Sequence, residues 1–268
     1  MIKANNKKIK GMLLVIAVMA VALGVFRTLI LVNYIEPETG FYVSGTNIGT
    51  VFAAVTALVV LIIGMFGFFT RKIKAPEFLD SHSTVVVFSS ALCAFMYITV
   101  FLYGVYSLIT ASAPNYFLYA QVVLCIPCML NHISICSKEV REKNTPQSLL
   151  AMSEAVFFAV RIVEAFMDTN HQINVSQRSL ELVMLCAIMM FFLIEAKFQI
   201  KSEDTESGSI SKYFMAALAT VALSVVTLIP YLLVCLFWCF EAHFIVMDVL
   251  ECCVMIFAAS RVLTLRDN

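Results

Sequence analysis

The sequence predicts an all-α, polytopic membrane protein of about eight transmembrane helices, and its composition is the first observation behind that prediction. Of the 268 residues, 61% are hydrophobic and only 13% are charged, whereas an ordinary soluble domain carries about 25% charged residues. The mean hydropathy is +0.92. This composition leaves too little polar surface to cover a globule in water, so most of the exterior must face lipid.

The second observation is the number and length of the apolar runs. A helix needs about 20 apolar residues to cross roughly 30 Å of hydrocarbon. Runs of this kind lie near residues 11–32, 47–69, 84–110, 116–135, 148–168, 177–198, 213–240 and 244–262. The first run follows a basic tail but is longer than the apolar region of a signal peptide, so it is predicted to be a retained helix. Only short connections remain, which predicts one membrane domain over residues 1–268 and leaves no room for a soluble catalytic domain.

The third observation is the distribution of Lys and Arg between alternate connections. Fifteen lie in the N-terminal tail, the even-numbered connections and the C-terminus, whereas the intervening connections 33–46, 111–115, 169–176 and 241–243 contain none. The fifteen are Lys3, Lys7, Lys8, Lys10, Arg71, Lys72, Lys74, Lys138, Arg141, Lys143, Lys197, Lys201, Lys212, Arg261 and Arg266. Because basic loops stay in the cytoplasm, both termini are predicted to be cytoplasmic and the chain to cross the plasma membrane an even number of times.

A parallel repeat of four plus four helices is one interpretation of the order of these runs. Shifting the first four runs by 134 residues brings each close to one of the last four and maps Arg27 onto Arg161. The halves would be residues 1–136 and 148–268, and a substrate site would be expected between them. The alternative is chance similarity among apolar runs.

Charged residues inside the runs are the strongest functional signal. A charge at the bilayer centre costs about 3 kcal/mol or more, so such residues normally face a protein interior or a watery cavity and pair with one another. Seven of them are predicted to share the outer third of the membrane and to form a substrate-binding cluster. These are Arg27, Arg161, Glu164, Arg178, Glu181, Asp248 and Glu251.

Helical spacing supports the prediction of a cluster. Glu154, Arg161 and Glu164 fall within about 80° of one helix face at 100° per residue, and both Arg178 with Glu181 and Asp248 with Glu251 are i,i+3 pairs. Arg27 and Arg161 are predicted to hold an anionic group, with the acidic residues as counter-charges or cation ligands. Glu154 is predicted to lie on a proton or ion path toward the cytoplasm.

These charges lead to two hypotheses about function. In the first, the protein binds or translocates a small charged solute or ion through an outward-facing polar cavity. In the second, it is a non-transporting subunit, sensor or scaffold whose buried charges lock helices together or pair with a partner. Snorkelling of individual side chains to the headgroups is a third account. Transport requires a wet continuation of the cluster lined by Glu154 and Asn131, whereas a scaffold should be sealed below Arg161.

The segment Tyr34–Tyr42 lies directly outside Arg27. Pro37 and Gly40 predict a tight turn, and the flanking tyrosines are typical of a membrane interface. The acidic residues of this turn would lie above the cluster.

The positions of the cysteines bear on two further kinds of protein, a disulfide-stapled ectodomain and a metal-binding protein. The nine cysteines fall within or at the ends of apolar runs, which excludes a disulfide-stapled ectodomain. A stripe of Cys125, Cys128, Met129, His132 and Cys136 contains soft ligands suited to copper(I) or zinc, but core packing explains it better, so no metal is predicted.

No phosphate-binding loop, H-E-x-x-H or G-x-S-x-G motif occurs. This favours a non-enzymatic role without a cofactor. The 18 basic and 18 acidic residues balance, which argues against nucleic-acid binding. The predicted partners are the lipid bilayer and a small solute or ion.

Overall fold

The computed structural model describes residues 2–35, 42–43, 45–70, 83–111, 115–137, 145–167, 176–199, 209–238 and 242–264. These residues form eight α-helices, together with one isolated bridge between Ile35 and Tyr42. The helices are α1 (Ile2–Asn33), α2 (Ile48–Thr70), α3 (Thr84–Thr110), α4 (Tyr116–Cys136), α5 (Thr145–Met167), α6 (Ser176–Gln199), α7 (Ser209–Trp238) and α8 (Ala242–Thr264). The predicted turn at 36–41 and most of the polar connection 201–212 lie outside the described residues.

Each predicted run corresponds to one helix, and the run 84–110 coincides with α3. The largest difference is at the N-terminus, where α1 begins at Ile2, nine residues before the predicted apolar run. Six helices (α1, α2, α3, α4, α6 and α7) are long and apolar enough to cross a membrane. The other two carry three charged residues each: Glu154, Arg161 and Glu164 on α5, and Asp248, Glu251 and Arg261 on α8. The chain therefore has the helices of a multi-pass membrane protein.

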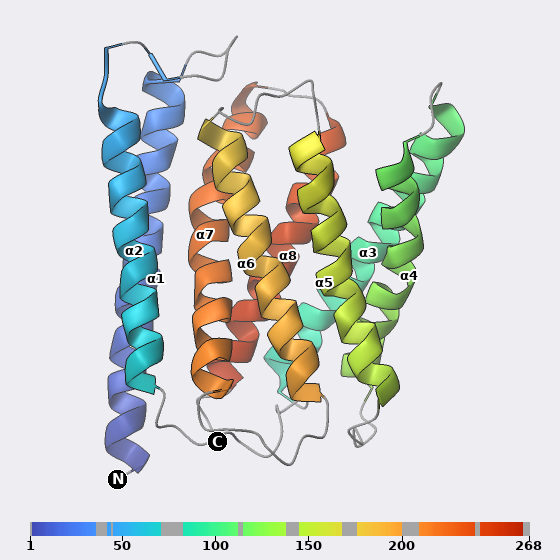
Figure 1. Cartoon of the computed structure of the whole chain (residues 1–268), viewed down its shortest axis with the longest axis horizontal. Helices are drawn as coiled ribbons and strands as arrows, with labels where there is room; N and C mark the ends of the chain where they lie inside the picture. Colours follow the sequence, from blue (N-terminus) through green and yellow to red (C-terminus); the bar gives the residue numbers. More distant parts are fainter. Residues whose placement is uncertain are drawn as a thin grey trace.

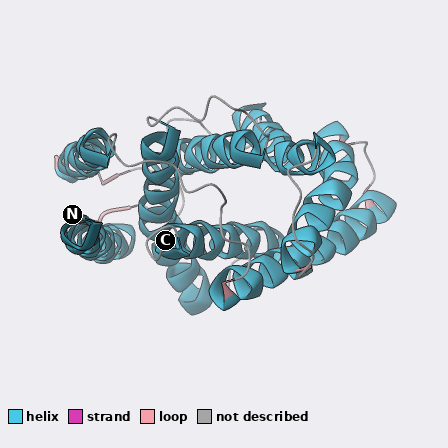
Figure 2. Ribbon diagram, turned by 90° about the horizontal axis from the view of Figure 1, so that it is seen from below, coloured by secondary structure: helices cyan, strands magenta, loops and turns pink. Residues whose placement is uncertain are grey.

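Six of the helices form a closed ring. Contacts run from α3 to α4, α5, α6, α7, α8 and back to α3, while α1 and α2 pack outside the ring against α7. Figure 2 shows this ring along the helix axes, with the α1–α2 pair to one side. α1 begins and α8 ends at the same face of the bundle (Figure 1). That face is called the terminal face below, and the opposite face, where α5 ends and α6 and α8 begin, is called the far face.

The four-plus-four repeat is not shown by this arrangement. α1 and α2 lie outside the ring, whereas their expected counterparts α5 and α6 are members of it. α1 approaches α7 closely at Gly24, where an added Cβ would lie 3.3 Å from the backbone oxygen of Val225. A small residue at such a point lets two membrane helices pack backbone to backbone.

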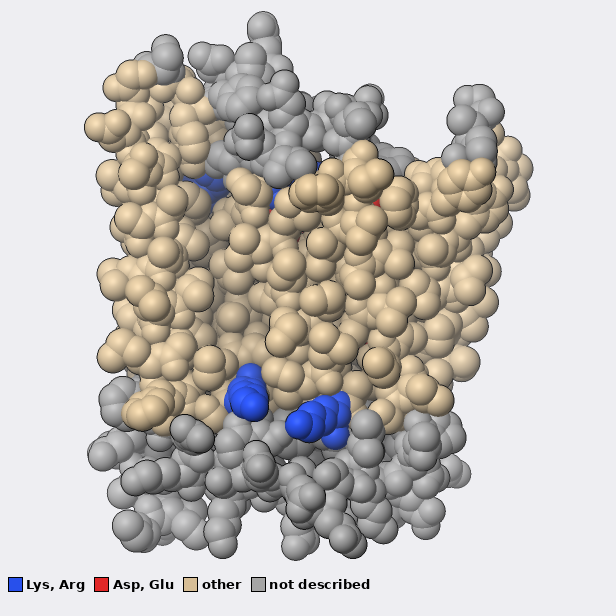
Figure 3. Space-filling view, viewed as in Figure 1, with Lys and Arg blue, Asp and Glu red and all other residues tan. Residues whose placement is uncertain are grey.

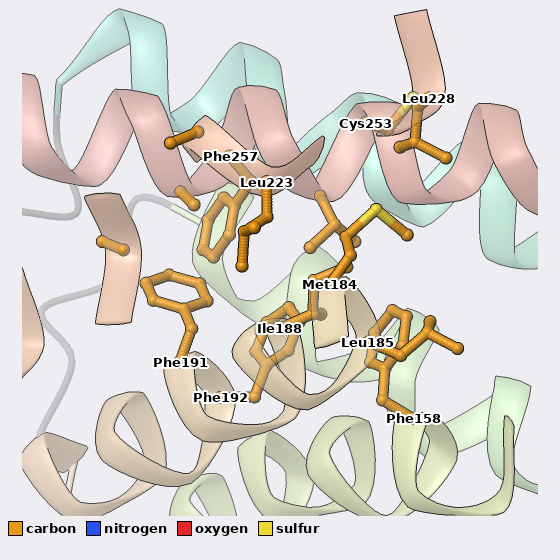
Figure 4. Packing of buried hydrophobic residues seen from close by; sticks show 14 of the residues in the cluster. Phe158, Met184, Leu185, Ile188, Phe191, Phe192, Leu223, Leu228, Cys253 and Phe257 are labelled. Atoms are coloured by element: carbon orange, nitrogen blue, oxygen red, sulfur yellow. The ribbon is translucent and has the colours of Figure 1, made fainter. Parts of the chain in front are cut away.

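Aromatic side chains fill the centre of the ring. Their ring centroids lie 5.1–6.3 Å apart, in stacked, tilted and edge-to-face pairs. This aromatic layer consists of Tyr97, Phe157, Phe158, Phe191, Phe192, Tyr213 and Phe257, and each member is at most 1% exposed. Figure 4 shows Phe158, Phe191, Phe192 and Phe257 pointing toward one another from α5, α6 and α8. These described side chains are therefore packed against one another across the centre of the ring.

The outer surface is apolar, as a lipid-facing surface requires. Large hydrophobic side chains such as Phe68, Phe88 and Ile109 are more than 60% exposed. On the face in Figure 3, uncharged residues form a broad band, and the visible described basic residues lie toward its two edges. This distribution agrees with a bundle whose middle is surrounded by hydrocarbon.

The aromatic layer should contribute strongly to stability, whereas lipid-facing rings should not. We expect Phe192→Ala to lower the free energy of unfolding in detergent by about 3–5 kcal/mol, because it opens a cavity in a packed interior. Phe88→Ala, the same truncation at a lipid-facing site, should change it by only about 0.5 kcal/mol. Equal losses in the two variants would contradict the proposed packing.

Candidate functional site

Arg161 is the centre of a cluster of ionic side chains near the far face of the ring. Its guanidinium Nη1 donates a hydrogen bond to Glu164 Oε2 at 2.9 Å, one turn along α5. Its Nη2 lies 3.8 Å from Glu181 Oε1 on α6 and 3.7 Å from Glu251 Oε1 on α8. One cation thus joins three helices that are adjacent in the ring or face each other across it.

Three further residues complete the Arg161 cluster. Arg178 donates to Glu181 Oε2 at 3.0 Å and to the backbone carbonyl of Ala165 at 3.0 and 3.2 Å, which ties the start of α6 to the end of α5. Gln121 on α4 donates to Glu164 Oε2 at 2.5 Å. Asp248, one turn before Glu251 on α8, is within electrostatic range of Arg161 and Glu181. The cluster is Gln121, Arg161, Glu164, Arg178, Glu181, Asp248 and Glu251.

Carboxyl groups outnumber guanidinium groups in this cluster. Four carboxyl groups accompany two guanidinium groups, and Glu251 and Asp248 are almost fully buried. Asp248 Oδ2 and both carboxylate oxygens of Glu251 have no hydrogen-bond partner in the described part of the chain. The Arg161, Arg178, Glu164 and Glu181 side chains keep 13–24% of their surface exposed. The cluster is therefore accessible at its rim and unsatisfied at its buried end.

Arg27 is placed differently from the other six predicted site residues. It is fully buried, donates to Tyr42 Oη at 3.0 Å, and lies with Cζ 5.0 Å from the centroid of the Phe52 ring. Its helix packs against α7 and α2, whereas the cluster is built on α4, α5, α6 and α8. Helical spacing within one run carries no information on which neighbouring helix an arginine will face, so the predicted grouping of Arg27 with Arg161 is not seen in these contacts.

A groove of about 720 Å³ lies beside Tyr42, between α2 and the helices α6 and α7. Phe52, Val60, Leu180 and Leu223 are among its lining residues, most of which are apolar, and no member of the Arg161 cluster lines it. The sequence pattern did not indicate this groove, because it arises from the loose placement of α2 beside the ring.

Glu154 lies on the other side of the aromatic layer from Arg161. The fully buried rings of Phe157 and Phe158 come between the two along α5. Glu154 Oε1 accepts a 2.5 Å hydrogen bond from Asn131 Nδ2 and lies 3.3 Å from His132 Nε2. In the described residues, Glu154 and Asn131 therefore form a separate buried site and do not continue the cluster.

A third buried ionic group lies nearest the terminal face. Arg261 Nη2 donates to Glu195 Oε1 at 2.8 Å, and the Tyr213 hydroxyl donates to Glu195 Oε2, which joins α6, α7 and α8. The Arg261 guanidinium also lies 5.1 Å from the Phe257 ring centroid. Arg261 is 1% exposed and lies inside α8. The prediction that it belongs to the C-terminal tail is therefore wrong. Without it, fourteen basic residues remain on the predicted cytoplasmic side. The signal that could have revealed this pair is Glu195, an in-span carboxylate without an assigned partner.

The cysteine and histidine stripe of α4 is mostly buried. Cys125, Cys128 and His132 are at most 1% exposed, and Cys128 Sγ lies 3.5 Å from Ser153 Oγ. Among the described residues, no group of three or more His, Cys, Asp and Glu side chains is arranged to hold a metal ion. The stripe packs against α3 and α5.

Comparison of the chain with protein-family models, with curated proteins and with solved structures finds no match.

Removal of the central cation should destabilise the bundle. Arg161→Ala leaves four carboxyl groups facing one another, and we expect it to cost about 3–5 kcal/mol of unfolding free energy. Arg178→Ala should cost less, because Arg178 lies at the rim and joins only α5 and α6. Adding Glu251→Gln to Arg161→Ala should recover part of the loss, which a double-mutant cycle in detergent measures. Purely additive effects would contradict the direct pairing of Arg161 with Glu251.

Proposed function

We propose that this chain binds a small solute carrying positive charge at the Arg161 cluster, and that solute binding or translocation across the membrane is its function. The observation that carries the proposal is the set of buried carboxylate oxygens on Asp248 and Glu251 that accept no hydrogen bond within the described residues. Buried polar atoms in native proteins are almost always satisfied, so a group of unsatisfied acceptors is expected to await a donor.

The surplus of carboxyl groups supports a cation as the ligand. The two arginines already have carboxylate partners, so an anion would have to displace Glu164 or Glu181. An ammonium or guanidinium group would instead bring donors to Glu251 and Asp248. An organic cation also fits better than a metal ion, because the described acidic side chains do not form a metal-binding group.

The position of the cluster supports binding from one side only. Its rim is partly exposed at the far face, while the aromatic layer fills the ring beneath it. Translocation would therefore require the aromatic rings to move apart, as in a carrier that alternates between two conformations.

The membrane orientation is a second part of the proposal. Fourteen Lys and Arg residues lie in the connections, tails and helix ends of the terminal face, and none lies in the connections of the far face. We propose that the termini are cytoplasmic and the cluster opens to the outside of the plasma membrane.

A scaffold role is the second candidate, and the Glu195–Arg261–Tyr213 group favours it. This group is fully buried and its carboxylate is paired on both oxygens, as expected for a lock between helices. The buried rings of the aromatic layer below Arg161 also support this candidate, because a scaffold needs no open path through the ring.

Ligand-dependent stability distinguishes the two candidates. A saturating ligand at 100 times its dissociation constant adds about 2.7 kcal/mol to stability. We expect one of a panel of tetramethylammonium, ethanolamine, putrescine and guanidinium, at equal ionic strength, to raise the melting temperature of the purified protein by several degrees. Acetate and phosphate should leave the melting temperature unchanged.

Matched variants locate the binding site. Glu251→Gln should abolish the shift, because it removes the buried carboxylate, whereas Glu154→Gln should keep it, because Glu154 lies beyond the aromatic layer. A shift that persists in Glu251→Gln would place binding elsewhere. A flat response to the whole panel would favour the scaffold.

Orientation is tested in intact cells. An epitope tag inserted at position 113 should be labelled by antibody without permeabilisation, because the connection between α3 and α4 lies at the far face. A tag after Asn268 should be labelled only after permeabilisation. The reverse pattern would place the cluster on the cytoplasmic side.

A further inference from the structure

His132 and Glu154 face each other in a fully buried pocket between α3, α4 and α5. Both side chains have no exposed surface, and His132 Nε2 lies 3.3 Å from Glu154 Oε1. Ser90 on α3 contacts the other ring nitrogen, with its Oγ 2.9 Å from His132 Nδ1. The Tyr97 ring stacks on the imidazole with centroids 5.8 Å apart, and the Phe257 ring meets it edge to face at 5.0 Å. These contacts reach both nitrogens of the imidazole and pack two aromatic rings against it.

The hydrogen bonds of Ser90 determine which nitrogen of His132 carries a hydrogen. Ser90 Oγ lies 2.9 Å from Nδ1 and 3.1 Å from the backbone carbonyl of His132, and we assign its hydrogen to the carbonyl because a carbonyl can only accept. A hydroxyl has one hydrogen to give, so at Nδ1 the Ser90 oxygen must accept. Nδ1 therefore carries a hydrogen, and a neutral His132 would present a bare lone pair at Nε2.

That lone pair would face a carboxylate oxygen. Glu154 Oε1 accepts a hydrogen bond from Asn131 and lies 3.3 Å from His132 Nε2, which has no hydrogen-bond partner in the described residues. Two acceptors 3.3 Å apart in a dry interior repel unless a hydrogen lies between them. Either a protonated Glu154 or a protonated His132 supplies that hydrogen.

The charges of the groups around Glu154 also indicate that the pair holds a proton. The titratable groups that face Glu154 in the described structure, besides His132, are Tyr97 and Cys93 on α3 and Cys128 on α4. None of them is a cation at neutral pH. The residue of α8 that contacts His132 is Phe257, which carries no charge. A carboxylate with no exposed surface and no cation beside it costs several kcal/mol. One added proton makes the pair neutral.

We infer that His132 and Glu154 form a buried proton-binding site that holds one shared proton, with Ser90 setting the histidine tautomer. Asn131 Oδ1, Glu154 Oε2 and the Tyr97 hydroxyl also lack hydrogen-bond partners in the described residues. These atoms provide acceptors through which the proton can leave the pair. The inference does not depend on a solute binding at the Arg161 cluster, since the aromatic layer separates the two sites.

Nitrogen NMR of the full chain, labelled with ¹⁵N-histidine and held in lipid nanodiscs, tests the tautomer. The chain has four histidines, His82, His132, His171 and His243, and loss of a signal in His132→Gln assigns the relevant one. At neutral pH we expect Nδ1 to be protonated. A bare Nδ1 with a protonated Nε2 would overturn the inference, because a neutral histidine could then donate to an ionised Glu154.

Infrared spectroscopy locates the shared proton. If NMR shows a bare Nε2, a carboxylic acid carbonyl band should be present in the wild type and absent from Glu154→Gln. If NMR shows both nitrogens protonated, no such band is expected. If Nε2 is bare and Glu154→Gln removes no carbonyl band, the pair holds no proton. That result would refute the proposed site.

Ser90→Ala tests the role of the hydroxyl. Without Ser90, the imidazole is free to carry its hydrogen on Nε2, so we expect loss of the shared proton at neutral pH. Ser89→Ala is the matched control, because Ser89 bonds to Ser260 on α8 and should leave the His132 signals unchanged. An identical tautomer in wild type and Ser90→Ala would show that Ser90 does not set it. If Ser90→Ala fails to fold, the spectra of the wild type, His132→Gln and Glu154→Gln still decide whether the pair holds a proton.

Discussion

Ionised side chains buried in a lipid-facing bundle must be neutralised within the protein, because hydrocarbon supplies neither water nor counter-ions. This constraint organises the ring. Arg161 joins α5, α6 and α8 near the far face, and nearer the terminal face Glu195 on α6 accepts from Arg261 on α8 and Tyr213 on α7. A helix that rotated or slid would separate opposite charges in a low dielectric, so these two levels hold the register of the helices between them.

The aromatic layer lies between the two levels and makes them independent. On α5, α6 and α8, phenylalanine rings occupy the positions between one charged level and the next. These rings fill the centre of the ring between the two levels, and no hydrogen bond or ion pair joins the Arg161 cluster to Glu154 in the described residues. The Arg161 cluster and the Glu154 pocket therefore act as separate chemical sites, even though Glu154 and Arg161 lie on one helix.

The buried carboxyl groups differ in how completely their oxygens are satisfied, and our proposals for their roles rest on that difference. Both carboxylate oxygens of Glu195 have donors, as a lock between helices needs. Both oxygens of Glu251 lack hydrogen bonds, and one oxygen of Glu154 does too. An unsatisfied buried acceptor is costly, so these two carboxyl groups are where a ligand and a proton are expected to bind.

The sequence by itself determined the eight helices and most members of the Arg161 cluster, because both depend on order along one chain. Hydrophobic length sets where a helix can cross hydrocarbon, and i,i+3 spacing places Arg161 beside Glu164 and Arg178 beside Glu181. Only the tertiary structure decided that Arg27 meets Tyr42, that Arg261 is buried against Glu195, and that His132 lies between Ser90 and Glu154. Those partners lie on different helices. Which side chains meet depends on the rotation and neighbours of each helix, and these are set by packing over the whole ring, which no local pattern specifies.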